Sequence, residues 1–285
     1  MLGGEAAPAR ARWLLLAPTA LLYTVTFLVP LILLLVFSVA TWDRGVIRLG
    51  FSLANYRDFF ADGVTAAIFG RTVRLAALIT GVCLVLGYPV AAFMRHCGPR
   101  MRLVLVVLVV SPLLTSVIVR NVAWLLILGR TGLVNTGLQA MGVVDAPLKL
   151  MYNELGVVIA VVHVYLSFMV LPIFGALISI EPALEESAAS LGAKSWQVFW
   201  NVTLPLSMPG VAAGCTLVFV LSMGVYLTPV IMGGNFVVTL PMVISEVVRN
   251  QFNWANGSAL ALVLLLFVTV LLSASARLQR RGSES

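Results

Sequence analysis

Six long apolar segments recur along the chain, and they constrain its fold more than any other feature of the sequence. They cover residues 13–39, 71–94, 103–128, 155–179, 208–232 and 257–276. At about 1.5 Å of rise per residue, each is long enough to cross about 30 Å of hydrocarbon as a helix. Lipid admits only helices or closed barrels, and these segments lack the alternation of barrel strands. The sequence therefore predicts an all-α integral membrane protein, with six transmembrane helices in a single domain over residues 1–285.

The composition excludes the main alternatives to a membrane protein. Hydrophobic residues make up 61% of the chain and charged residues 10%, whereas soluble proteins carry about 25% charged residues. A water-soluble enzyme and a disordered chain are both excluded on this basis. The net charge of +7 comes from basic residues dispersed between the apolar segments, so we expect no nucleic-acid-binding surface. Cys83 and Cys215 lie in apolar segments, and no CxxC spacing predicts a metal or redox site.

Lys and Arg are distributed unevenly between the connections, which predicts the orientation of the chain. Unbalanced positive charge lies on one set of connections: Arg10, Arg12, Arg95, Arg100, Arg102, Lys194, Arg277, Arg280 and Arg281. On the other set, acidic residues accompany the basic ones, as Asp145 and Glu154 accompany Arg130 and Lys149. Because cytoplasmic connections carry the excess of Lys and Arg, we expect both termini in the cytoplasm. The first apolar segment exceeds the ~7–15 residues of a signal-peptide core, so we expect a retained anchor.

The connection over residues 180–206 is the longest on the predicted cytoplasmic side, and its first half predicts a helix. Glu181-Pro182 suits a helix start, since proline fits the first position and acidic residues stabilise the positive end of the dipole. An apolar face follows at helical spacing, formed by Leu184, Ala188 and Leu191. Gly192 then provides the usual left-handed stop.

The second half of this connection predicts a further amphipathic stretch. Its apolar residues fall on one side: Trp196, Phe199, Trp200 and Leu204. We expect the stretch to end at Pro205, which cannot donate a helical hydrogen bond. By pattern alone, the element is either an organised helix–glycine–helix unit or a connector that rests on lipid.

The residues of this connection favour the organised unit. The run from Glu185 to Ala188, then Gly192, then Leu204-Pro205 resembles the EAA loop of ATP-binding-cassette (ABC) importer permeases. In that family Glu-Ala-Ala is followed after three residues by Gly and later by Leu-Pro; Ser187 replaces the first Ala here. The resemblance implies that the short helix docks on an ATPase, with Glu186 presented to it. The implied coupling residues are Glu185, Glu186, Ser187, Ala188, Gly192 and Pro205.

The resemblance extends along nearly the whole chain. Residues 71–74, 87–89, 115–124 and 227–229 are similar to the permease branch associated with spermidine and putrescine uptake. It implies the type I importer permease fold and half of a translocation path for a small organic solute, polyamine-like or related, in the bacterial inner membrane. The implied partners are a second permease, two cytoplasmic ATP-binding subunits and a periplasmic solute-binding protein.

The chain itself is not expected to bind ATP or to be an enzyme. A phosphate loop needs G-x-x-x-x-G-K-[ST], and the nearest match is residues 188–195. Alanine occupies both required glycine positions, Ala188 and Ala193. We therefore expect no cofactor in this chain, and we expect ATP and Mg²⁺ to be bound by the partner ATPase subunits.

Polar residues inside the apolar segments are candidates for the translocation path. Arg120 lies within the third segment, where a charge costs about 2.5–3.5 kcal/mol and should face a cavity or the bundle interior. It is either a path residue or a structural residue that satisfies carbonyls or an acid. With Asn121, and with Tyr226 and Thr228 near the break expected at Pro229, it forms the predicted path set.

The fifth segment also bears on the solute and on helix packing. Polyamine-importing relatives often have Asp where Val225 stands, so a neutral, zwitterionic or anionic solute is an equal alternative. Gly210-x-x-x-Gly214 permits a close helix contact. The rival function is a secondary transporter driven by an ion gradient, but such proteins usually carry acidic residues inside the membrane. None lies well inside any of the six segments.

Overall fold

The computed structural model describes residues 17–43 and 45–283, with side chains up to residue 277. Residues 13–16 of the first predicted span, and Arg10 and Arg12, lie outside the described residues. The chain divides into two compact units: Met1–Gly63 with Ile244–Val263, and Val64–Val243 with Leu264–Ser285. The prediction of a single domain stays a prediction.

Six helices in the described part of the chain are long and apolar enough to cross a membrane. They are Ala17–Ser38, Gly63–His96, Val117–Ala140, Glu154–Ile178, Ser195–Met223 and Trp254–Arg277. A bent helix pair, Pro229–Phe236 with Leu240–Arg249, is a further candidate for a broken span, with 92° between its halves. The number of spans agrees with the six predicted.

The first unit contains the N-terminal span and a short connection built on a hairpin. Its elements are the π-helical turn η1 (Thr24–Leu28), α2 (Val29–Ser38), β1 (Thr41–Asp43), β2 (Val46–Arg48), α3 (Ala54–Ala61) and the parts of α12 (Leu240–Arg249) and α13 (Trp254–Ser283) between residues 244 and 263. Strands β1 and β2 pair antiparallel, with Trp42 opposite Ile47. The Asn55 side chain donates to the carbonyls of Ser38 and Ala40 at 3.1 and 2.9 Å, which fixes the turn after α2.

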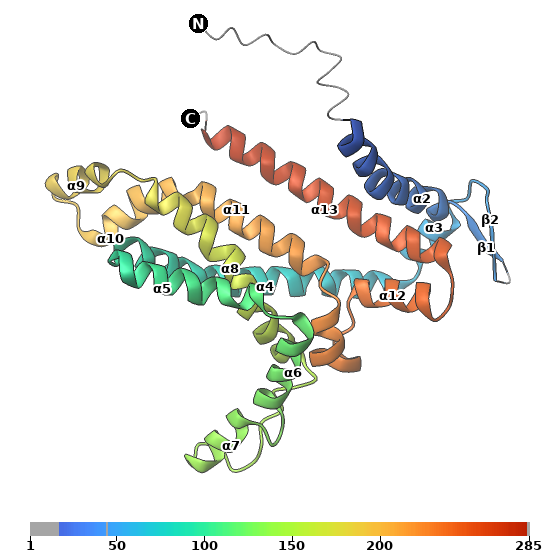
Figure 1. The fold of residues 1–285 in the computed structure, drawn as a ribbon, viewed down its shortest axis with the longest axis horizontal. Helices are drawn as coiled ribbons and strands as arrows, with labels where there is room; N and C mark the ends of the chain where they lie inside the picture. The colour runs from blue at the N-terminus through green and yellow to red at the C-terminus, as the bar shows by residue number, and fades with distance from the viewer. Residues whose placement is uncertain (1–16, 44, 284–285) are drawn as a thin grey trace, which may run out of the picture. The chain divides into compact units, whose positions relative to one another are not determined.

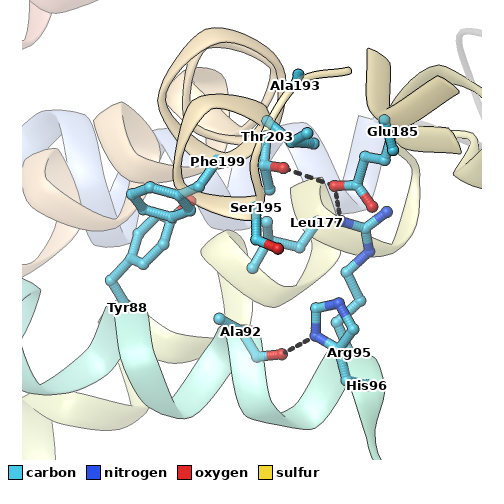
Figure 2. A pocket seen from close by; sticks show the side chains of 12 residues that line it. Tyr88, Ala92, Arg95, His96, Leu177, Glu185, Ala193, Ser195, Phe199 and Thr203 are labelled. Carbon is cyan, nitrogen blue, oxygen red and sulfur yellow. Dashed lines mark hydrogen bonds and ion pairs between the residues drawn. The ribbon is translucent and has the colours of Figure 1, made fainter. Parts of the chain in front are cut away.

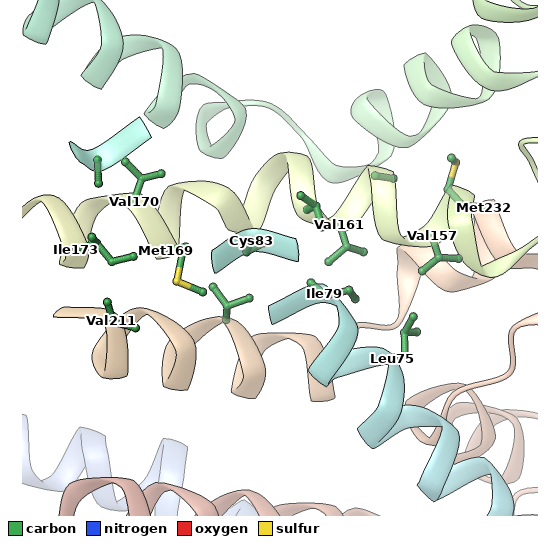
Figure 3. Packing of buried hydrophobic residues seen from close by; sticks show 14 of the residues in the cluster. Leu75, Ile79, Cys83, Val157, Val161, Met169, Val170, Ile173, Val211 and Met232 are labelled. Carbon is green, nitrogen blue, oxygen red and sulfur yellow. The ribbon is translucent and has the colours of Figure 1, made fainter. Parts of the chain in front are cut away.

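The second unit is a helical bundle (Figure 1). Its elements are α4 (Gly63–His96), α5 (Pro99–Val110), η2 (Ser111–Leu114), α6 (Val117–Leu128), α7 (Leu133–Ala140), α8 (Glu154–Ile178), α9 (Pro182–Ser190), α10 (Ser195–Val198), η3 (Phe199–Thr203), α11 (Leu204–Met223), η4 (Pro229–Gly233) and η5 (Gly234–Phe236), with the remaining parts of α12 and α13. Its core lies around α8, which packs against α11 and α5. Figure 3 shows Ile79 of α4, Met169 of α8 and Val211 of α11 among the buried side chains that meet there.

Two glycines allow α11 to approach α8 closely, as the Gly-x-x-x-Gly spacing predicts. A Cβ atom on Gly210 would lie 2.5 Å from the Cβ of Ala176 and 2.6 Å from the carbonyl oxygen of Pro172. A Cβ atom on Gly214 would lie 2.9 Å from the sulfur of Met169. Larger residues at these positions would separate the two helices that form the centre of the bundle.

The third predicted span is wrong as a single helix over residues 103–128. Helix α5 ends at Val110, the 3₁₀ turn η2 follows, and α6 begins only at Val117. Pro112 lies in this turn and lacks the N–H that an α-helix needs in its interior. The chain is extended at Thr115, with ψ of 143°. The candidate span therefore runs through α6 and α7 to Ala140.

The fifth predicted span, and the expected helix end at Pro205, also need correction. Helical structure runs without interruption from Ser195 to Met223. The N–H of Leu204 donates to the carbonyl of Phe199, five residues back, so the chain passes through the π-helical turn η3 and Pro205 falls in the first turn of α11. Pro205 has no N–H to donate to the turn before it, and the helix passes this position through the π-helical turn instead of ending there. The span ends at Met223 rather than at residue 232, because the helix is interrupted at Gly224–Tyr226 before Pro229.

Candidate functional site

The short helix predicted after Glu181 is present as α9, and Gly192 ends it in the expected way. The N–H of Gly192 donates to the carbonyl of Ala189 at 2.9 Å, and that of Ala193 to the carbonyl of Ala188 at 3.2 Å. Gly192 has φ of +90°, the left-handed conformation that side chains with a Cβ rarely adopt. The predicted left-handed stop is confirmed.

The outer face of α9 is apolar and exposed. Leu184 is 47% exposed and Leu191, just after the helix, is 90% exposed. Glu186 is exposed on another side of the helix, about 200° around from Leu184, and Ala188 is half-buried. The hydroxyl of Ser187 donates to the carbonyl of Ala183 at 2.7 Å, so Ser187 fits within the helix in place of alanine. The exposed surface of α9 thus offers two large apolar side chains on one side and a carboxylate on another.

Glu185 lies on a different side of α9 and contacts the bundle (Figure 2). Its Oε1 atom accepts hydrogen bonds from Arg95 Nη1 at 2.7 Å and from Thr203 Oγ1 at 2.6 Å. Arg95 Nη2 also donates to the carbonyl of Ile180, after the end of α8, at 3.3 Å. The side chains of Arg95 and Glu185 are only 10% and 23% exposed. One carboxylate therefore connects α9 to the end of α4 and to the π-helical turn η3.

The contacts of Glu185 lower its pKa. Partial burial by itself would raise the pKa, but the hydrogen bonds from Thr203 and Arg95 and the positive charge of Arg95 outweigh it. The carboxylate is thus held in its charged form. Charged hydrogen bonds of this kind are the stronger ones in proteins.

A pocket of about 320 Å³ lies beside this ion pair, between α9 and the end of α4. Tyr88, His96 and Phe199 contribute to its wall, together with the ion pair itself (Figure 2). Tyr88 and Ser207 share a hydrogen bond of 3.0 Å, and the rings of Tyr88 and Phe199 meet edge to face. The pocket leaves the underside of α9 only partly packed.

Sequence reasoning missed Arg95 and Thr203, and it did not separate the roles of Glu185 and Glu186. A signal was available, because adjacent residues of a helix point about 100° apart and cannot both face one partner. The partners of Glu185 come from segments 90 and 18 residues away, and no local pattern indicates them.

The predicted path residues lie at the two breaks in the spans. Arg120 Nη1 donates to the carbonyl of Pro112 at 2.9 Å, with the carbonyl and hydroxyl oxygens of Thr115 at 3.5 Å. These carbonyls lie at the interruption between α5 and α6, where helical donors are missing. Arg120 thus satisfies carbonyls freed by the break, which is the structural role left open by the sequence.

Asn121 and Thr228 are brought together, although they are far apart in sequence. The Thr228 hydroxyl donates to Asn121 Oδ1 at 3.3 Å, and the two residues are 6% and 0% exposed, respectively. Among the described residues, Asn121 Nδ2 and Arg120 Nε have no hydrogen-bond partner. Tyr226 is half-buried in the interrupted segment before η4. The four residues thus split into a buried pair and a half-buried pair.

Comparison with known proteins identifies the family of this chain. The profile described as "Binding-protein-dependent transport system inner membrane component" matches residues 4–282. The chain belongs to this family of transporter inner membrane components. It is therefore a permease subunit of an ABC importer, a multi-pass membrane protein and not an enzyme.

Individual relatives agree with the family. The spermidine/putrescine transport system permease protein PotB of Haemophilus influenzae is 33% identical over 250 residues, which cover 86% of each chain. PotB of Escherichia coli is 31% identical over 234 residues, 81% of this permease and 83% of that one. A chain of the bacterial alginate ABC transporter has the same fold, with a TM-score of 0.74 at 18% identity over 95% of this permease and 96% of that chain. These matches show the type I importer permease fold.

Proposed function

We propose that this permease forms one half of a translocation path, together with a second permease, two cytoplasmic ATP-binding subunits and a periplasmic solute-binding protein. The observation that carries the proposal is α9, a short helix outside the spans whose exposed face is apolar and whose end is fixed by a left-handed glycine. Each permease would place its own α9 on one ATP-binding subunit, so two permeases engage an ATPase dimer.

We propose that both termini, the α4–α5 connection and α9 face the cytoplasm. The excess of Lys and Arg on this set of connections supports this orientation. Cys97, in the α4–α5 connection, should react with a membrane-impermeant maleimide only in inside-out vesicles. An Ala146→Cys substitution in a background without native cysteines should react only in right-side-out vesicles. The reverse pattern would contradict the orientation.

We propose that Arg120 and Tyr226 line the path, with Asn121 and Thr228 supporting the wall behind them. Arg120 and Tyr226 are half-buried, whereas Asn121 and Thr228 are buried near the same two helix breaks. This difference supports the division. Backbone that leaves helical geometry at membrane depth is tolerated where it is buried in protein or lines a cavity. We place the breaks at residues 111–116 and 224–226 beside this path.

We propose a polyamine-like small organic cation as the solute, selected mainly by the binding protein. The two PotB relatives support this class. Val225 supplies no carboxylate and Arg120 is cationic, so this half of the wall should bind a dication weakly. Weak binding along the path suits passage, because tight binding would retain the solute.

The test is uptake by the complete complex in proteoliposomes with ATP inside and the binding protein outside. Labelled putrescine and spermidine should accumulate, and an ATPase-inactive partner subunit is the control. Uptake of an anionic or neutral solute in place of both amines would contradict the solute class but keep the importer function. Accumulation of a solute without ATP or binding protein would contradict the importer function.

A further inference from the structure

Two neighbouring glutamates of α9 have different surroundings, and the inner one connects the helix to the bundle. Glu186 is exposed on a side of the helix about 200° around from Leu184, whereas Glu185 is directed inward to Arg95 and Thr203 (Figure 2). The two carboxylates therefore cannot have one role.

Apolar packing holds α9 only weakly. None of its residues is buried, and its large apolar residue Leu184 is exposed, as is Leu191 just after the helix. The pocket of about 320 Å³ under it removes further packing contacts. The ion pair of Arg95 with Glu185 and the hydrogen bond from Thr203 thus provide the main directional attachment of α9 in the described part of the unit.

The attachment is stronger than a surface ion pair, because both side chains are mostly buried and further hydrogen bonds satisfy them. Exposed pairs contribute little to stability. A mostly buried pair is different, since removing one partner leaves the other charge uncompensated. A displacement of α9 would have to carry Arg95 and Thr203 with it or break these bonds.

Both anchor points are suited to passing a displacement into the membrane. Arg95 lies in the last turn of α4, a helix of 34 residues. Thr203 is the last residue of the π-helical turn η3, which leads directly into α11. π-helical turns are frequent at functional sites, and their hydrogen-bond pattern differs from the α-helices on either side.

We propose that Glu185 is the positioning residue that ties the docking helix to the spans, so that movement of α9 is passed through Arg95 into α4 and through Thr203 into α11. Glu186 remains the residue presented to the ATP-binding subunit. This inference rests on the proposed function, because it assigns the step between the ATPase and the path.

The test compares solute transported per ATP hydrolysed in reconstituted complexes. Glu185→Gln and Arg95→Gln should lower this ratio about tenfold while ATP hydrolysis continues, because the remaining charge loses its partner. Thr203→Val keeps the size and the ion pair, and should lower the ratio about twofold, because the carboxylate loses one hydrogen bond and keeps the one from Arg95. The exchanged pair Glu185→Arg with Arg95→Glu should recover part of the loss. Glu181→Gln and Arg100→Gln are the matched controls, since each removes the same kind of charge from an exposed position nearby.

A second readout does not depend on transport. Spin labels at Ala183→Cys on α9 and Gly98→Cys after α4, in a background without native cysteines, should show one narrow distance distribution in the complex, with and without ATP. Glu185→Gln should broaden that distribution. Unchanged distances and an unchanged ratio in Glu185→Gln and Thr203→Val would overturn the inference. A wild-type complex that transports no tested solute would instead contradict the proposed function, and the label distances would still decide the role of Glu185.

Discussion

The backbone at Gly192 sets the direction in which the chain leaves the docking helix. Its φ of +90° is accessible to glycine and costly for a β-branched residue, by about 1–3 kcal/mol. Nothing lies within 4 Å of the position that a Cβ would take, so the cost is backbone strain and not a clash. Residues that tolerate the left-handed region, asparagine above all, should therefore be accepted in its place.

Gly192→Val should displace α9 and reduce uptake by the reconstituted complex about tenfold, through the strain just described. Gly192→Asn should keep most of the uptake, because asparagine tolerates positive φ. The measurement is binding-protein-dependent uptake at equal amounts of inserted complex. Full uptake and full ATPase stimulation in Gly192→Val would show that this turn has no part in coupling.

The lowered pKa of Glu185 predicts a dependence of stability on pH. A carboxylate with a depressed pKa stabilises the folded state above its unfolded value of about 4.3, and this contribution is lost as the pH falls through the folded pKa. Thermal unfolding of the purified complex should thus show wild type more stable than Glu185→Gln at neutral pH. The difference should shrink once the pH falls below about 4. An equal difference at all pH values would contradict a charged Glu185.

Arg120 is proposed both to stabilise the break between α5 and α6 and to repel a cationic solute, and two substitutions distinguish these effects. Arg120→Gln should lower thermal stability by about 1–3 kcal/mol, because carbonyls at the α5–α6 break lose a charged donor. It should also lower the KM of the complex for a dicationic solute, since a positive charge leaves the wall. Arg120→Lys keeps the charge and is the control for the second effect. Loss of stability with no difference in KM between the two variants would leave Arg120 purely structural.

At the scale of elements, hydropathy predicted where apolar helices lie but not where they are interrupted. The predicted span over residues 155–179 nearly coincides with α8, which has no break. The prediction of one span over 103–128 was wrong because residues 103–119 are mostly apolar on both sides of Pro112. Hydropathy does not depend on the backbone N–H that proline lacks. The opposite error occurred at Pro205, which predicted a helix end although the π-helical turn η3 leads directly into α11 and the helix continues through this position.

In the site too, features set by neighbouring residues were predictable, whereas contacts between distant segments were not. Gly192 and the helix before it were predictable, because start, apolar spacing and stop are all local signals. The contact of Glu185 with Arg95, and that of Asn121 with Thr228, join segments that only the packed bundle brings together. Sequence reasoning named Asn121 and Thr228 as path residues, but it could not show that both are buried.

The close contact of α11 with α8 at Gly210 yields a prediction about packing. Gly210→Leu should destabilise the fold by at least about 1–3 kcal/mol, because the added atoms meet Ala176 and the backbone of α8. Gly81→Leu is the matched control, since nothing lies within 4 Å of a Cβ there. Thermal unfolding in detergent micelles should show a lower midpoint for Gly210→Leu only. Equal midpoints would mean that α8 and α11 are not held at this distance in the membrane.

At the scale of the whole molecule, the permease has membrane-spanning helices and a short helix proposed to dock on an ATPase, and it has no phosphate loop of its own among the printed residues. In the part of the chain that the structure describes, α9 is the one helix proposed to dock on an ATP-binding subunit, and residues 188–195, the nearest approach to a phosphate loop, form its end and the turn after it. The six apolar segments carry no acidic residue well inside them, so a proton or sodium ion has no carboxylate to occupy there. Energy for accumulation should therefore come only from the partner subunits.

The purified permease alone, reconstituted in vesicles, should neither hydrolyse ATP nor concentrate putrescine or spermidine, with or without a proton or sodium gradient. The same preparation should gain ATP-dependent uptake when the second permease, the ATP-binding subunits and the binding protein are added, which shows that the protein was competent. Transport and ATP hydrolysis can be measured on one batch of vesicles, by uptake of labelled solute and by release of phosphate. Gradient-driven uptake by the single chain would establish the secondary transporter instead, because a permease that depends on α9 has no means of using a gradient. Absence of uptake in both preparations would point to a different solute, and substitution of the solute in the complete complex would then identify it.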